Sequence, residues 1–154
     1  MREIGDQRWT GALRLGGGMT RSEFLEWVRT KVVAPRATPG HGPRGEGWYW
    51  EVMVAPNTYF AVDVLDPHAR TIRVHLHTSD EEVKRRWLQR RPAARAVSIS
   101  LPWTAPFYRD NGARKRCYLG YAWSARSNDY AEEQGAVLAL AEWLDQFSDR
   151  GAGG

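Results

Sequence analysis

The chain has 154 residues, of which 42% are hydrophobic and 26% charged, and its net charge at pH 7 is +4. A chain of this length buries roughly two-thirds of its unfolded surface, so it needs neither a metal nor a disulfide to fold, and its single cysteine excludes an intramolecular disulfide. No segment approaches the roughly 18 apolar residues of a membrane span, and the N-terminus lacks the apolar segment of a signal peptide. We therefore expect a cytoplasmic protein without a membrane partner.

The first part of the chain is predicted to be a flexible arm followed by a helix. Residues 1–19 mix charged residues with glycine and show no hydrophobic period, apart from a possible short strand at residues 12–15. A capping box formed by Thr20 and Glu23 then begins a helix that extends to about Val33. The apolar residues of this helix recur at helical spacing: Phe24, Leu25, Val28 and Val32.

A loop and three strands come next. Residues 35–47 contain three prolines and four glycines, which predicts a mobile loop that is either a disordered connector or a lid that depends on a partner. Strands are predicted at Gly47–Ala55, Tyr59–Leu65 and Thr71–His77. Their connections have hairpin length, so the three strands must form an antiparallel meander.

The second half of the chain is predicted to add two helices and two strands. A helix with an acidic first turn and a basic end covers residues 78–91 and stops before Pro92. Alternating residues predict strands at Arg95–Leu101 and Arg116–Ser124, and the segment between them is predicted to be a loop that turns at residues 110–112.

A long C-terminal helix completes the expected fold. It begins at the caps of residues 127–129 and extends to about Phe147. We therefore predict an α+β domain over residues 20–148, with a disordered tail at 149–154. The elements follow the order α-β-β-β-α-β-β-α along the chain. The five strands form a mainly antiparallel sheet, and the helices pack mostly on one of its faces.

Alternation assigns the strand side chains to two faces of the sheet. The apolar face, which the helices should cover, holds Trp48, Trp50, Val52, Val54, Phe60, Val62, Val64, Ile72, Val74 and Leu76. The opposite, polar sheet face holds Glu51, Asp63, Arg73, His75 and His77. These side chains have three interpretations: ligands of a divalent metal such as zinc, a general acid and base, or a solvated face with ordinary cross-strand pairs. We favour the solvated face and expect no metal.

A second candidate surface is basic and aromatic. It comprises Arg85, Arg86, Arg90, Trp103, Phe107, Tyr108, Arg114, Lys115 and Arg116. The predicted loop also carries Arg109. If the predicted helix and the loop are neighbours, they form a positive patch, and aromatic rings beside arginine suit either a protein interface or stacking on single-stranded bases. A solvated helix face with aromatic residues that cap the core is the third interpretation.

Motifs of known catalytic sites are absent from the sequence. There is no phosphate-binding glycine loop, no GxSxG and no HExxH motif. Cys117 lies within an apolar alternating strand, so we expect a buried structural thiol and not a nucleophile.

The order of predicted elements resembles two known folds. Over residues 20–101 it resembles the core of the PD-(D/E)xK nuclease superfamily, and Asp63 matches the Asp of that family's second strand. The predicted third strand, Arg73-Val74-His75-Leu76-His77, lacks the family's carboxylate and lysine, so nuclease activity of this type is not expected. Over residues 20–147 the order resembles the type III secretion chaperone-like fold, which implies a non-enzymatic binder that often forms dimers.

These observations favour a small non-enzymatic binding protein, of an adaptor, chaperone-like or immunity type, that acts through protein–protein contacts without a cofactor. The expected partner is another protein or a second copy of the chain. The first alternative is a basic nucleic-acid-binding accessory protein. The second is a metal-dependent hydrolase or nuclease that uses the polar sheet face.

Overall fold

A computed structural model describes residues 18–65, 69–112 and 116–148. The predicted arm up to residue 17, its short strand and the predicted tail at 149–154 lie outside the described residues. So do Arg114 and Lys115 of the predicted basic surface.

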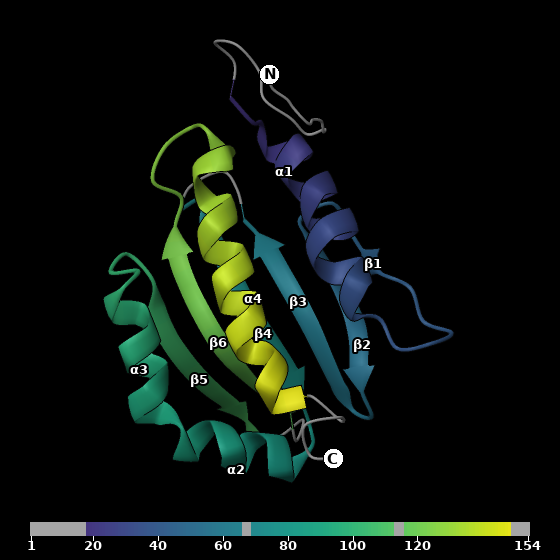
Figure 1. The fold of residues 1–154 in the computed structure, drawn as a ribbon. Helices are drawn as coiled ribbons and strands as arrows, with labels where there is room; N and C mark the ends of the chain where they lie inside the picture. Colours follow the sequence, from purple (N-terminus) through teal and green to yellow (C-terminus); the bar gives the residue numbers. More distant parts are fainter. Residues whose placement is uncertain (1–17, 66–68, 113–115, 149–154) are drawn as a thin grey trace.

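The structure has an α+β fold built on an antiparallel sheet, as the sequence predicts (Figure 1). The described strands are β1 (Arg44–Gly45), β2 (Tyr49–Ala55), β3 (Thr58–Val64), β4 (Thr71–Thr78), β5 (Ala105–Asn111) and β6 (Arg116–Ser124). They form one six-stranded sheet in the order β1-β2-β3-β4-β6-β5, in which every neighbouring pair is antiparallel. The predicted count of five strands was therefore one too low.

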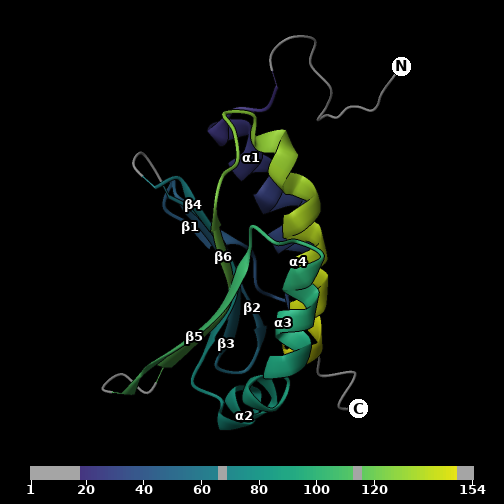
Figure 2. The same ribbon diagram turned by 90° about the vertical axis from the view of Figure 1, so that its left-hand side faces the viewer.

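The helices lie on one side of this sheet (Figure 2). The described helical segments are α1 (Arg21–Trp27), the π-helix η1 (Val28–Val33), the 3-10 turn η2 (Ala34–Arg36), α2 (Glu81–Gln89), α3 (Arg91–Ile99), the 3-10 turn η4 (Tyr130–Glu133) and α4 (Gln134–Ser148). None of them is long and apolar enough to cross a membrane. The other side of the sheet faces away from this helical layer.

The predicted starts of the first and last helices are present in the structure. The Thr20 hydroxyl accepts the backbone N–H of Glu23 at 3.1 Å, and the Glu23 carboxylate accepts the backbone N–H of Thr20 at 2.9 Å. At the other end of the chain, the Asp129 carboxylate accepts the backbone N–H of Ala131 at 3.0 Å and so caps η4 before α4. Each cap satisfies an N–H group that has no partner inside its helix.

The strand predicted at Arg95–Leu101 is wrong, because these residues belong mainly to helix α3. The preceding helix, α2, ends at Gln89, before Pro92 as predicted, and Pro92 lies in the first turn of α3, where a missing N–H costs no hydrogen bond. The alternating pattern also fits helical spacing: Ala94 is buried and Val97 packs against the core, whereas Ile99 is 78% exposed. A short apolar pattern of this kind cannot distinguish a helix from a strand.

Two strands form where loops were predicted. Strand β5 occupies the predicted loop before Arg116 and pairs with β6 at the edge of the sheet. It contains Pro106 and charged residues, which edge strands tolerate because one of their sides makes no ladder hydrogen bonds. The predicted loop at 35–47 contains η2 and the short strand β1, which pairs with β2.

The core lies between the sheet and the helices. The apolar strand residues predicted to face it are buried from Val52 onward, and Trp50 is half-buried against them. Trp48 departs from the prediction: it precedes the first residue of β2, where alternation no longer applies, and its side chain is 40% exposed. Cys117 is a fully buried free thiol, as predicted.

Candidate functional site

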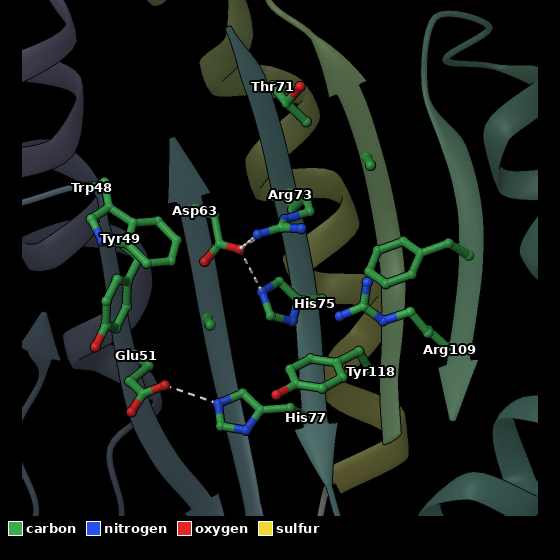
Figure 3. Close-up of a pocket in the computed structure, with 13 residues that line it drawn as sticks. Trp48, Tyr49, Glu51, Asp63, Thr71, Arg73, His75, His77, Arg109 and Tyr118 are labelled. Carbon is green, nitrogen blue, oxygen red and sulfur yellow. Dashed lines mark hydrogen bonds and ion pairs between the residues drawn. The ribbon is translucent and has the colours of Figure 1, made fainter. Parts of the chain in front are cut away.

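The face of the sheet opposite the helices holds a pocket of about 600 Å³ (Figure 3). Side chains from β2, β3, β4, β5 and β6 line it, and the polar sheet face predicted from the sequence forms its centre. Glu51, Asp63, Arg73, His75 and His77 all line this pocket. Short hairpin links place them on one face because the links fix the pairing register of β2, β3 and β4.

Small residues form the floor of the pocket. Ala61 and Gly120 are the cross-strand neighbours of His75 on its two sides, and Ala122 lies two residues beyond Gly120. A Cβ atom at Gly120 would lie 2.3 Å from the carbonyl oxygen of Val74 and 2.6 Å from the Cα of His75. A side chain at Gly120 would therefore collide with the backbone of β4, so glycine permits the close approach of β6 to β4 beside His75.

Asp63 joins two basic side chains at the centre of the pocket. Its Oδ2 accepts hydrogen bonds from the Nε of Arg73 at 2.8 Å and from the Nε2 of His75 at 3.2 Å. Burial alone would raise the pKa of Asp63, but His75 and Arg73 outweigh it, so the pKa lies below its usual value. The ionised carboxylate can only accept, so the Nε2 of His75 carries the proton. The other ring nitrogen, Nδ1, is buried and has no partner among the described residues.

Glu51 and His77 form a second cluster beside the first. The carboxylate of Glu51 accepts from the Nε2 of His77 at 2.9 Å and from the Nε of Arg44 at 2.6 Å. The Nη1 of Arg116 donates to the Nδ1 of His77 at 2.9 Å, and the ring of Tyr59 stacks on the imidazole with centroids 5.0 Å apart. Burial lowers the pKa of His77, although the hydrogen bond to Glu51 opposes this shift. This imidazole is therefore neutral and fixed in one tautomer.

Aromatic side chains and one further arginine form the walls. Trp48 and Tyr49 lie at one end, and Phe107 and Tyr118 at the other. The guanidinium of Arg109 lies over the Tyr118 ring, 5.5 Å from its centroid. Among the described residues, no carboxylate pairs with Arg109.

The sequence did not lead to every residue of this wall. The sequence places Phe107 and Arg109 in the basic and aromatic surface, but it assigns Tyr118 and Gly120 to no site. Two features of the sequence point to Tyr118 and Gly120: the alternation of polar and apolar residues in β6, and a glycine inside that strand, which indicates close approach of another backbone. Their use required knowing that β6 pairs with β4.

The basic and aromatic surface predicted from the sequence is not assembled as one patch. Arg85 and Arg86 form ion pairs with Glu82 of their own helix. The guanidinium of Arg90 lies 5.1 Å from the ring centroid of Trp143 on α4. These three arginines therefore belong to the helical layer, away from the pocket.

The other described members of that predicted surface lie on both sides of the sheet. Phe107 lines the pocket and Arg116 contacts its His77, whereas the next residue, Tyr108, packs toward the core. Trp103 is covered by the guanidinium of Arg126 at 3.9 Å from its ring centroid. Strand β5 causes this separation, because neighbouring residues of a strand point to opposite faces.

A metal site is not formed by the residues that the structure describes. Over residues 18–65, 69–112 and 116–148, no group of three or more His, Cys, Asp or Glu side chains has the arrangement to hold a metal ion. The carboxylates of Glu51 and Asp63 are instead occupied by hydrogen bonds from histidine and arginine.

Comparison with known proteins gives no further identification. No family model, no curated protein and no solved structure matches the chain.

Proposed function

We propose that the protein is a non-enzymatic binding protein and that the pocket holds a segment of a partner protein. The observation that carries this proposal is a hollow of about 600 Å³, lined by aromatic and arginine side chains, on the sheet face away from the described helices. Binding pockets have volumes of this order, and Trp, Tyr and Arg dominate the binding energy of protein interfaces.

The internal order of the pocket supports binding over catalysis. Glu51 and Asp63 are each held between a histidine and an arginine, and His77 is hydrogen-bonded through both ring nitrogens. Groups with this many partners are fixed before a ligand arrives, which lowers the entropic cost of binding. The same partners occupy the lone pairs and protons that acid–base chemistry would need.

A pocket-filling variant tests this proposal. Random-sequence peptides are selected for binding to the wild-type protein and then measured against Ala122→Trp, which places an indole in the half-exposed part of the pocket floor. The matched control is Leu138→Trp, at a half-exposed position on α4 in the helical layer. The proposal requires that peptides bind the wild type and Leu138→Trp and lose their affinity for Ala122→Trp. Equal binding to all three proteins would place the binding surface elsewhere.

Hydrolysis is a second candidate, and one observation favours it. The Asp63–His75 pair has the arrangement of a general base oriented by a carboxylate, and the Nδ1 of His75 has no partner among the described residues. The test is turnover of chromogenic ester and phosphate substrates by the wild type and by His75→Gln. Turnover that His75→Gln abolishes would favour the enzyme, and its absence favours binding. We do not propose nucleic-acid binding, because the described arginines of the predicted basic surface lie on different sides of the sheet.

A further inference from the structure

We infer that the bound segment is acidic and that one of its carboxylates lies between Arg109 and Arg73, beside His75. This inference rests on the proposed function, because it names the chemistry of the segment that the pocket would take. Three observations lead to it: the charge balance of the pocket, the fixed position of the Arg109 guanidinium, and the unpaired Nδ1 of His75 beside it.

The charge balance of the pocket face is positive. Among the described residues, four arginines, Arg44, Arg73, Arg109 and Arg116, meet three carboxylates on or beside this face: Glu51, Asp63 and Glu46, whose charge acts on the lining residue Tyr49. Two of the arginines pair with these carboxylates, and a third donates to the neutral imidazole of His77. The fourth, Arg109, has no carboxylate among the described residues. An anionic group is the ligand that would neutralise this surplus.

Arg109 is already positioned to receive a carboxylate. Its guanidinium lies over the ring of Tyr118, and Figure 3 shows it reaching from the β5 side of the pocket toward His75. Stacking on an aromatic ring restricts the side chain but leaves the planar edge of the guanidinium open. That edge matches the two oxygens of a carboxylate, which it binds with two parallel hydrogen bonds.

The environment of His75 is a second, independent indication of a ligand. The side chain is 5% exposed, and its Nδ1 is buried without a hydrogen-bond partner among the described residues. An unpaired buried nitrogen is costly unless a ligand or a water molecule satisfies it. The Nε2 of His75 is taken up by Asp63, so Nδ1 is the polar atom of the ring that a ligand can satisfy.

Arg73 completes the group. Its Nε and Nη2 are directed to Asp63, and Nη1 makes no hydrogen bond among the described residues. The carboxylate of the segment would therefore meet Arg109 from one side and Arg73 from the other within this pocket. A carboxylate fits better than a phosphate, because the four arginines and three carboxylates among the described residues leave a surplus of one positive charge, which a carboxylate already neutralises.

Binding measurements with matched peptides test the inference. The probe is the tightest pocket-dependent peptide from the random-sequence selection, prepared in three forms: as selected, with each Asp and Glu replaced by its amide, and with phosphoserine in place of each acid. Affinities are measured by fluorescence anisotropy for the wild type, Arg109→Gln and Arg85→Gln. Arg85 is the matched control, because it is an exposed arginine on α2 away from the pocket. Thermal unfolding verifies that each variant is folded.

The inference predicts that the selected peptides are rich in Asp and Glu and that the amide form binds the wild type at least about tenfold more weakly. Arg109→Gln should weaken the acidic form by a similar factor and leave the amide form unchanged, and Arg85→Gln should change neither. An amide form that binds equally well would overturn the inference while the pocket-dependent binding still stands. Tighter binding of the phosphoserine form, or an equal loss with Arg85→Gln, would overturn it as well. If no peptide depends on the pocket, the proposed function itself fails.

Discussion

The Asp63→Asn variant is predicted to lose about 2 kcal/mol of stability at pH 7 and progressively less below pH 4. An asparagine has the shape of aspartate but no charge, and its single carbonyl oxygen cannot replace an ionised acceptor for both Arg73 and His75. One charge-assisted hydrogen bond contributes about 1.5–3 kcal/mol. We take a value in the lower part of that range, because a third of the Arg73 side chain is in contact with solvent and is screened.

The pH dependence follows from the direction of the pKa shift. The pKa of Asp63 is lower in the folded protein than in the unfolded chain, so its contribution is complete above the unfolded value of about 3.9. It is lost as the pH falls through the folded pKa. In that range the wild-type carboxyl becomes protonated and resembles the amide, so the stabilities of the two proteins should converge.

Urea unfolding of both proteins at pH 7 and pH 3 measures this difference. The matched control is Asp145→Asn, which removes a half-exposed carboxylate paired with Arg36 and should cost no more than about 1 kcal/mol. A loss of less than about 0.5 kcal/mol at pH 7, or a loss of the same size at both pH values, would refute the ion-pair account of Asp63.

Three further predictions concern the pocket floor, the second cluster and the first helix. Gly120→Ala should destabilise the protein by about 1–3 kcal/mol, because its Cβ would meet the Val74 carbonyl. The control, Gly135→Ala in α4, has open space around its Cβ and should be neutral or stabilising, and thermal unfolding compares the two variants. Because the pKa of His77 is lower in the folded protein than in the unfolded chain, the wild type should lose stability as the pH decreases from about 7 to 5. His77→Gln should lose less stability over the same pH range, measured by urea unfolding. Thr20→Ala should lose about 1 kcal/mol, measured by urea unfolding, and an unchanged midpoint would show that the capping box is dispensable.

The polar face could be predicted from the sequence because local rules determine it. Alternation within β2, β3 and β4 separates polar from apolar residues, and short turns leave one way to pair these strands. Glu51, Asp63 and His75 therefore come together without any long-range information. The hydrogen bonds among them could not be predicted, because they depend on side-chain geometry.

The other wall of the pocket could not be predicted, because it depends on pairing between distant segments. Strand β6 lies beside β4 although a pair of helices and β5 separate them in the sequence, and no turn fixes that register. Helix α3 was misread because seven alternating residues also fit helical spacing, and β5 was missed because Pro106 is uncommon in strands other than edge strands. The sequence therefore could not place Arg109 and Tyr118 beside the polar sheet face.

The most direct test of the account is an NMR titration with the selected peptide. The backbone amide signals of Ala61, Gly120 and Ala122 report on the pocket floor, and those of α2 report on the arginines of the helical layer. The account predicts saturable shifts at the floor and at Arg109, with α2 unchanged. Shifts concentrated on α2, with the floor signals unmoved, would contradict the claim that the hollow sheet face is the binding surface.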